Sequence, residues 1–446
     1  MKIAIVGAGI SGLGAAWLLA KKHDVTLFEA DSHFGGHANT VNVSCSNGVV
    51  PVDTGFIVCN NRNYPNFLAL LDQLKVKYVP TEMSFGVSLG NGNFEYAGSE
   101  KLNAMLAQPL NIFRPRFISM IKSLVRFYKE TSEIKNEDVA GITLKDYLNQ
   151  NNYSAGFVRD HILPMAAAIW STPSKKVADF PLTSFLRFCQ NHGLLQIKDR
   201  PQWYTINGGS KCYVSAIIEN TRANFQKNTK VTAIRRKSGQ VEIVTSDGQV
   251  KIFDRVLIAT HANTATNIIK DMDSIEEDIL SRFSYAKNRA VLHSDPSFMP
   301  KRKKAWSSWN YLQEDENDDE RLSVTYWMNK LQPLDTDQPL FVTLNPSREP
   351  DPALVHYEKM YDHPIFDLNT LEAQKRLLDI MGHRQIWYAG AHFGYGFHED
   401  GLQSGLYAAE KLGEISRPWN IPDMNGRIIA VDGQIEIEDQ LAGAAE

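Results

Sequence analysis

The chain has 446 residues, of which 43% are hydrophobic and 22% are charged, and this length and composition predict a globular protein with two domains. Its net charge of −4 argues against nucleic acid as the main partner. The four cysteines are scattered without a C-x-x-C pair, which favours a reducing compartment such as the cytoplasm and argues against a structural zinc site.

The first 30 residues have the order strand, glycine-rich turn, helix, strand. Ile3–Val6 is a short apolar run of the kind that is buried in a parallel sheet, and Val25–Phe28 is a second one. Between them lie three glycines at the spacing G-x-G-x-x-G: Gly7, Gly9 and Gly12. The second strand ends in Glu29, which is followed by Ala30.

Each part of this stretch has a physical role at a bound dinucleotide. Gly7 permits a tight turn, Gly9 lets the backbone approach a pyrophosphate, and Gly12 lets the helix lie close to the sheet. The helix begins at Ile10–Ser11, and its N-terminus offers N–H groups and a partial positive charge to the diphosphate. Glu29 can accept hydrogen bonds from the adenosine ribose. The stretch therefore predicts a dinucleotide site.

A targeting segment is the alternative interpretation of the same residues. Ile3–Ala20 carries no charge and has the length of a signal-peptide core or a short membrane span. The glycine spacing and the acidic strand end favour the dinucleotide site. No other stretch is long and apolar enough to cross a bilayer.

A second glycine-rich element follows at once. Gly35 and Gly36 are paired, and His37 comes next. A hairpin is predicted around Asn47-Gly48, and it leads into Asp53, Thr54 and Gly55. A second glycine-rich element beside the first is expected where a ligand is longer than one nucleotide.

At this point the chain resembles the FAD-dependent amine oxidase and phytoene desaturase superfamily. Its members open with the G-x-G-x-x-G unit, end the second strand in Glu and continue into a Gly-Gly segment. Most members carry Arg after the glycine pair, whereas this chain has His37. The run Phe34–Val41 is similar to a subgroup of bacterial flavoproteins often found beside cyclopropane-fatty-acid synthase genes, and to the amino-terminal flavin domain of plant cyclopropane synthases.

The resemblance implies an α/β fold with a Rossmann-like FAD-binding domain of the GR2 type and an inserted mixed α+β substrate domain. The expected FAD-binding domain is discontinuous and comprises residues 1–56, 205–265 and 383–417. The expected substrate domain comprises residues 57–204 and 266–382, and residues 418–446 are expected to form a polar tail.

Later parts of the chain carry further expected cofactor contacts. Asn207–Ser210 resembles the middle Gly-Gly element of the superfamily, and the match places Val231 at the adenine and Thr260 at the ligand crevice. Near the carboxy end, a strand runs into Gly390, and a helix is predicted to begin at the dipeptide Asp400-Gly401 and continue from Leu402. The helix dipole would stabilise negative charge on a reduced flavin. Gly401 and Gly405 lie one turn apart, which predicts room for something flat or thin against this helix.

The substrate domain offers weaker signals. Lys101–Lys129 contains no acidic residue, and its segment 114–129 predicts an amphipathic helix with an apolar face that includes Phe117, Met120, Leu124 and Val125. This helix either packs on the core or lies on an anionic membrane, at the inner face of which the protein would be peripheral. The candidate cavity residues are aromatic or imidazole side chains in apolar or glycine-rich surroundings: Trp170, Trp327, His392 and Tyr395.

Three functions remain open at this stage, and all use FAD. The first is an oxidoreductase that desaturates a lipid-like acyl substrate or reduces its methylene branch. The second is an amine oxidase, many of which place a lysine near the flavin, on a strand around Lys287–Leu292. The third is a non-catalytic flavin-binding partner of a lipid methyltransferase. No Ser-His-Asp, metal or two-carboxylate constellation is recognisable, so the catalytic residues stay unassigned and no metal is predicted.

Overall fold

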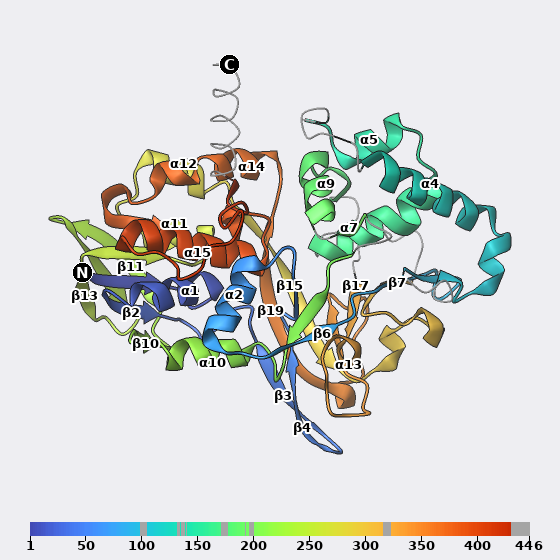
Figure 1. Ribbon diagram of the computed structural model, residues 1–446, viewed down its shortest axis with the longest axis horizontal. Helices are drawn as coiled ribbons and strands as arrows, with labels where there is room; N and C mark the ends of the chain where they lie inside the picture. The colour runs from blue at the N-terminus through green and yellow to red at the C-terminus, as the bar shows by residue number, and fades with distance from the viewer. Residues whose placement is uncertain are drawn as a thin grey trace.

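The computed structural model describes most of the chain (Figure 1). The described residues are 1–98, 105–131, 134, 139, 141–170, 177–191, 193–195, 200–314 and 323–429. Within them, the side chains of five residues are not described: Trp170, Ser184, Arg187, Phe188 and Asn191. The predicted cavity role of the Trp170 side chain therefore lies outside the described part of the chain.

A five-stranded parallel sheet takes its strands from widely separated parts of the chain. Its strands, in spatial order, are β10 (Asn224–Gln226), β2 (Asp24–Phe28), β1 (Lys2–Val6), β14 (Arg255–Ile258) and β20 (Ile386–Tyr388). Ile3, Ala4 and Ile5 are each fully buried, which explains why the strand is a continuous apolar run instead of an alternating one.

The two faces of this sheet have different coverings. Ile3 and Ile5 point into a core formed with helices, whereas Ala4 and Val6 point into a core formed with a second sheet. The helices are α1 (Ile10–Leu19), α2 (Pro65–Leu74), α10 (Lys211–Glu219) and α15 (His398–Gly413). The other layer comprises the antiparallel strands β11 (Val231–Lys237), β12 (Gln240–Thr245) and β13 (Val250–Phe253), with α11 (Ala262–Ile268) and α12 (Ser274–Leu280). This arrangement confirms the predicted Rossmann-like domain.

Helices α1 and α15 pack backbone to backbone, although they come from opposite ends of the chain. A Cβ atom added at Gly405 would lie 2.2 Å from the carbonyl oxygen of Ser11, and one added at Gly401 would lie 3.0 Å from Ser11 Oγ. The sequence pattern predicts a flat ligand against these two glycines. The structure instead places helix α1 there, because small residues let two helices approach closely.

A seven-stranded mixed sheet forms the second half of the molecule. Its strands, in spatial order, are β19 (Val355–Ile365), β15 (Ser284–His293), β18 (Phe341–Leu344), β17 (Ser323–Trp327), β16 (Trp309–Gln313), β7 (Phe85–Leu89) and β8 (Phe94–Gly98). Only β16 and β7 run parallel; the other neighbours are antiparallel.

A helical layer shares one core with strands β7, β8, β16 and β17 (Figure 1). Its main helices are α4 (Pro115–Thr131), α5 (Leu144–Gln150), α6 (Ala155–Phe157), α7 (Leu163–Trp170) and α9 (Leu182–Asn191), with a π-helical turn over Val158–Ile162. Short strands join the two halves of the molecule: β3 (Thr40–Cys45), β4 (Gly48–Asp53), β5 (Val58–Asn60), β6 (Tyr78–Thr81) and β9 (Trp203–Ile206). The smaller helices are α13 (Met328–Leu331) and α14 (Leu368–Lys375).

Residues 417–428 pack against the first half of the molecule, whereas the sequence predicts a polar tail from residue 418. Trp419 stacks on Trp17 with 5.6 Å between ring centroids, and Ile428 is fully buried. The guanidinium of Arg417 donates to Glu410 and to Asn66. The buried and hydrogen-bonded Arg417, the stacked Trp419 and the buried Ile428 hold this segment, although its composition is polar.

The close packing of α1 and α15 predicts the effect of a single methyl group. Gly405→Ala should lower the free energy of unfolding by about 3 kcal/mol or more, because the obstructing atom is backbone and cannot change rotamer. Gly98→Ala is the matched control, since its added Cβ would meet nothing nearer than 3.7 Å. Urea unfolding of both variants measures the difference; equal stability would contradict this packing.

Candidate functional site

The carboxyl ends of the parallel strands define one edge of the sheet. Because β1, β2, β14 and β20 run parallel, the residues that follow them meet at this edge: Gly7, Glu29, Ala259 and Ala389. Ligands of open α/β sheets bind at such an edge. The predicted dinucleotide residues therefore lie where the topology favours a site.

In the first glycine loop, the packing of the chain itself explains why some positions must be glycine. Gly7 has φ +104°, and its added Cβ would lie 2.6 Å from the Ala259 carbonyl oxygen. An added Cβ at Gly12 would lie 1.9 Å from the Gly7 carbonyl oxygen. At Gly9 nothing lies within 4 Å of the added atom. The fold thus explains two of the glycines and leaves open space over the third.

Glu29 is held in place at the end of β2. Its Oε2 accepts a hydrogen bond from the Ala8 N–H at 2.7 Å, and its Oε1 accepts one from the Asp31 N–H at 2.8 Å. Each carboxylate oxygen keeps a second lone pair for a ligand hydroxyl. The neighbouring Ala30 is exposed beside it.

The second glycine loop touches the first. The Gly35 N–H donates to the Ala8 carbonyl at 2.9 Å, and an added Cβ at Gly36 would lie 3.2 Å from Gly9 Cα. The carbonyl of His37 accepts from the Phe56 N–H at 2.7 Å, and an added Cβ at Gly55 would lie 2.2 Å from the same oxygen. Three predicted segments therefore form one backbone cradle around the open space.

The remaining predicted cofactor residues divide into two groups. Thr260 is partly exposed, and its Cγ2 atom would lie 3.3 Å from a Cβ atom at Gly7. Ile10 and Ser11 are both buried in the first turn of α1. By contrast, three side chains are committed to the protein. Leu402 packs on Gly14, Val231 lies in the core between the two sheets, and Thr54 hydrogen-bonds Asn39 and Tyr361.

The carboxylate of Asp400 is likewise occupied. Its Oδ2 accepts from the N–H groups of Tyr395 and Phe397 at 2.9 and 2.7 Å, and its Oδ1 accepts from Arg427 Nε at 2.6 Å. Asp400 thus fixes the loop before helix α15. At Gly390, the N–H donates to Ser404 Oγ at 3.0 Å, which ties β20 to α15.

Three histidines gather between the glycine cradle and the seven-stranded sheet. The ring centroid of His37 lies 6.5 Å from that of His261 and 5.4 Å from that of His363. His261 follows β14 and stacks on Tyr285, whereas His363 lies on β19. Sequence reasoning missed His363 and the grouping of the three rings, because only the pairing of distant strands brings His261 and His363 to His37. Among the described residues, no group of three or more His, Cys, Asp or Glu side chains is placed to hold a metal ion.

These imidazoles are neutral near pH 7. Burial lowers the pKa of His363 to about 4 and lowers that of His261 as well. Burial, assisted by the nearby His363, lowers the pKa of His37 well below its ordinary value. The Nε2 atom of His37 is buried and has no hydrogen-bond partner among the described residues. An unpartnered polar atom beside an open cradle is what a missing ligand would leave.

The other candidate cavity residues have different packing partners. His392 is buried, and its ring packs edge-on against Phe283 at 5.1 Å. Tyr395 is buried beside Arg427, and Trp327, at the end of β17, lies edge-on to Trp306. Their role at a substrate cavity stays a prediction.

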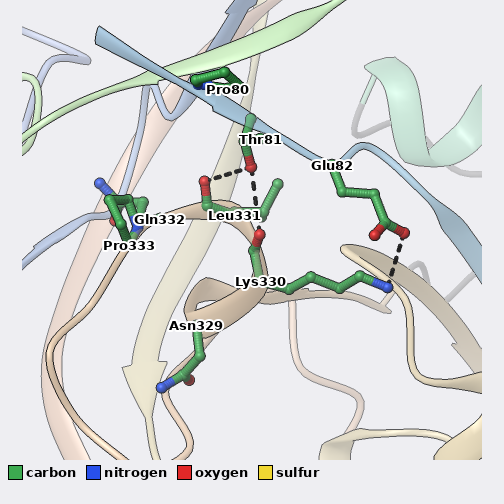
Figure 2. A pocket seen from close by; sticks show the side chains of 8 residues that line it. All are labelled: Pro80, Thr81, Glu82, Asn329, Lys330, Leu331, Gln332 and Pro333. Atoms are coloured by element: carbon green, nitrogen blue, oxygen red, sulfur yellow. Dashed lines mark hydrogen bonds and ion pairs between the residues drawn. The ribbon is translucent and has the colours of Figure 1, made fainter. Parts of the chain in front are cut away.

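A surface pocket of about 330 Å³ lies elsewhere, between β6 and the segment that follows β17 (Figure 2). Its lining residues are Pro80, Thr81, Glu82, Asn329, Lys330, Leu331, Gln332 and Pro333. Lys330 pairs with Glu82 at 2.9 Å, and Thr81 Oγ1 donates to the Leu331 carbonyl at 2.8 Å. None of the predicted cofactor residues lines this pocket, so it is not the dinucleotide site.

The glycine cradle, the acidic strand end and the two-part fold define an FAD-dependent oxidoreductase. Residues 10–338 match the family described as flavin containing amine oxidoreductase, and the chain belongs to that family. FAD is the cofactor of this family, which confirms the predicted cofactor. A search of curated protein sequences finds no match.

Solved structures with the same fold have varied activities. The CLA-producing fatty acid isomerase from P. acnes is 16% identical with a TM-score of 0.66, covering 92% of this chain and 98% of its own. Cyclohexylamine oxidase from Brevibacterium oxydans is 16% identical with a TM-score of 0.66, covering 93% and 98%. Putrescine oxidase bound to putrescine is 15% identical with a TM-score of 0.66, covering 92% and 99%. At these identities the likeness shows the fold.

Gly9 offers a test that separates folding from cofactor binding. Gly9→Ala should leave the thermal stability of the apoprotein within about 1 kcal/mol of the parent, because the added methyl group meets no protein atom. It should weaken FAD binding by a factor of ten or more, because that methyl group occupies the space over the loop. Flavin fluorescence titration and thermal unfolding measure the two effects. Unchanged FAD affinity would contradict the site.

The buried histidines predict that acid destabilises the protein. The pKa is lowered to about 4 for His161, His293 and His363, and to about 3 for His392 and His398. Below pH 6.5 the unfolded chain takes up protons that the folded chain does not, so the free energy of unfolding should fall towards pH 4. Each histidine contributes at most about 1.4 kcal/mol per pH unit.

Two carboxyl groups act in the opposite direction, because burial raises the pKa of Asp53 to about 6 and also raises the pKa of Glu399. They offset the effects of at most two histidines. Urea unfolding at pH 7.5, 6.5, 5.5 and 4.5 measures the slope, and His398→Gln should reduce that slope by at most about 1.4 kcal/mol per pH unit. Stability independent of pH over this range would contradict buried neutral imidazoles.

Proposed function

We propose that this FAD-dependent oxidoreductase acts on a neutral, lipid-like acyl substrate, either by desaturating it or by reducing a methylene branch. Bound FAD supplies the two-electron chemistry, and the protein contributes binding, orientation and exclusion of water. In this proposal the loop at Gly9 and the first turn of α1 hold the diphosphate, and Glu29 holds the ribose. Gly36, His37 and Gly55 complete the cradle.

The observation that carries the proposal is the identity of the residue on β15 that faces the histidine group. Successive side chains of a strand point to opposite faces. Asn288 is buried and contacts His363 at 2.9 Å, whereas its neighbour Lys287 is exposed. Within Lys287–Leu292, where the resemblance to amine oxidases implies a lysine, the residue that contacts His363 is therefore an amide.

A chain of amide hydrogen bonds fixes the proton on His363. The Arg289 N–H can only donate, so it sets Asn345 Oδ1 as its acceptor at 2.9 Å. Asn345 Nδ2 then donates to Asn288 Oδ1 at 2.7 Å, and Asn288 Nδ2 donates to His363 Nδ1 at 2.9 Å. Neutral His363 therefore carries its proton on Nε2 and offers that N–H to a ligand.

This donor favours a substrate with a carbonyl or carboxyl oxygen over one with an ammonium group. An N–H donor attracts an acceptor oxygen and repels a cation. The run Phe34–Val41, which resembles the subgroup linked to cyclopropane fatty acids, supports the same substrate class. A fatty acid isomerase among the structural neighbours is consistent with it, although amine oxidases are neighbours as well.

Anaerobic spectroscopy of the holoenzyme tests the substrate class. For a desaturase, the oxidised flavin bands should bleach on addition of a phospholipid with saturated or methyl-branched acyl chains. For a methylene reductase, dithionite-reduced enzyme should regain the bands on addition of a methylene-branched lipid. Cyclohexylamine and putrescine should have no effect in either assay. Bleaching by an amine alone would indicate an amine oxidase, and no response to any compound would indicate a non-catalytic partner of a lipid methyltransferase.

The chain of amide hydrogen bonds to His363 predicts different effects for substitutions at Asn288 and at its neighbour Lys287. Asn288→Asp replaces the amide donor by an acceptor, which moves the imidazole proton to Nδ1 and removes the donor at Nε2. Flavin reduction or reoxidation by the lipid should slow by a factor of ten or more, which corresponds to about 1.4 kcal/mol.

FAD affinity should stay within about twofold, because an altered proton position on His363 removes at most one hydrogen bond to a ligand. Lys287→Ala, on the opposite face of the same strand, is the control and should react at the parent rate. Nitrogen NMR of the histidine side chains reports the tautomer directly. Loss of activity in Lys287→Ala with normal activity in Asn288→Asp would contradict the assignment.

A further inference from the structure

Exposed apolar side chains concentrate on one short segment of the substrate half. Thirteen large hydrophobic residues of the described chain are exposed, and six of them lie between residues 106 and 125. These six form what we call the apolar tip: Leu106, Leu110, Ile112, Phe113, Ile118 and Val125. Leu110 is 68% exposed and Phe113 is 75% exposed. Exposed apolar residues scattered singly need no explanation, but a contiguous group of them marks an interaction surface.

The apolar tip shares only Val125 with the apolar face that the sequence predicts for this helix. Phe117, Met120 and Leu124 are buried in the core of the helical layer, so that face packs on the protein. The outer stripe of α4 carries Ile118 and Val125 at a spacing of seven residues, with lysines at positions 122 and 129 between and after them. Helix packing thus accounts for the predicted face and leaves the outer stripe unexplained.

Polar contacts hold the turn that carries the most exposed residues. This 3-10 turn, η1 (Pro109–Phe113), precedes α4. Asn111 Nδ2 donates to the Glu95 carbonyl at 3.0 Å, and Arg114 donates to the Asn93 carbonyl at 2.8 Å. Because the turn is anchored through Asn111 and Arg114, Leu110 and Phe113 are held outward at the surface.

The charge around the apolar tip is almost entirely positive. Residues 105–131 contain five basic residues and one acidic residue, Glu130, whose carboxylate pairs with Arg126. The basic residues are Arg114, Arg116, Lys122, Arg126 and Lys129. Arg116 is engaged by the buried carboxylate of Asp160, whereas Lys122 is exposed on the outer stripe. Apolar side chains surrounded by cations suit an anionic, apolar surface.

We propose that the apolar tip docks on the surface of an anionic phospholipid bilayer, with Leu110, Ile112 and Phe113 entering the headgroup region and the exposed basic residues of 114–129, Lys122 among them, facing lipid phosphates. A second copy of this chain fits less well, because a self-complementary contact would bring like charges together. None of the described helices has the length and apolar composition to span a bilayer, so the contact is peripheral. In Figure 1 helix α4 lies at the end of the molecule away from β1 and β2.

The inference rests on the proposed function for its purpose, because an enzyme that acts on phospholipid acyl chains must reach them. Docking itself is measured without turnover. Co-sedimentation of the holoenzyme with vesicles of phosphatidylcholine containing 30–40% phosphatidylglycerol (about that fraction gives a strongly anionic surface) should recover the protein in the pellet. Pure phosphatidylcholine vesicles should retain much less, and high salt should release the bound protein.

Two variants and two matched controls identify the surface. Leu110→Ser with Phe113→Ser should weaken binding by a factor of about ten or more, because the apolar area is lost. Lys122→Glu should weaken binding to the anionic vesicles by a factor of about five. Val250→Ser with Ile252→Ser replaces two exposed apolar residues on β13, and Lys237→Glu reverses an exposed charge on β11. Both controls should bind like the parent.

The outcomes separate docking from the proposed function. Vesicle binding that is absent, or that both sets of variants weaken equally, would overturn the docking surface. A dimer of the parent that dissociates in Leu110→Ser with Phe113→Ser would assign the tip to self-association and overturn it as well. A flavin that responds to detergent-dispersed lipid although vesicles do not bind would leave the proposed function intact. Vesicle binding with no flavin response to any lipid would support docking and contradict the substrate class.

Discussion

Backbone packing around the first turn of helix α1 is the constraint on which the cofactor site depends. The carbonyl of Ala259, which follows β14, lies against Gly7, and the Gly7 carbonyl lies against Gly12. Gly405 of α15 packs on the Ser11 carbonyl. Because the obstructing atoms are backbone oxygens, no change of rotamer could make room for a side chain. Gly9 alone faces open space, and the Gly35-Gly36 loop closes around it. The helix end that would receive a diphosphate is therefore held rigidly from three sides.

The hydrogen bonds of Asp53 and Thr54 form a polar joint between the half that contains the glycine cradle and the seven-stranded sheet that would face the substrate. Asp53 accepts from Thr40, Ser210 and Gln332, and these residues come from three separate parts of the chain. Thr54 and Asn39 hydrogen-bond Tyr361 on β19, next to His37 and His363. The pairing of β15 with β19 and β18 brings Asn288 to His363 and to Asn345. The contacts that fasten the two halves thus lie beside the hydrogen-bonding groups of the crevice.

The turn of the first cofactor loop can be predicted because its signal is local. The spacing of Gly7, Gly9 and Gly12 and the acid at the next strand end are recognisable in the sequence, although in the structure Gly7 also lies against the distant Ala259 carbonyl. The histidine group could not be predicted, because His261 and His363 lie far from His37 in sequence and meet only through strand pairing. The roles of Gly405 and of residues 417–428 were missed for the same reason, since each depends on a partner hundreds of residues away. The exposure of the apolar tip was not predicted, because amphipathic spacing does not say which apolar residues the core will cover.

The acyl chains of cells with and without this gene test the central claim most directly. An FAD-dependent oxidoreductase of neutral acyl substrates changes the hydrogen content of a chain by two atoms while it leaves the carbon skeleton unchanged. Mass spectrometry of the phospholipids should therefore show one class of acyl chain replaced by another that differs by two hydrogens. Identical acyl chains in the two strains, together with accumulation of an unoxidised amine in the strain without the gene, would contradict it.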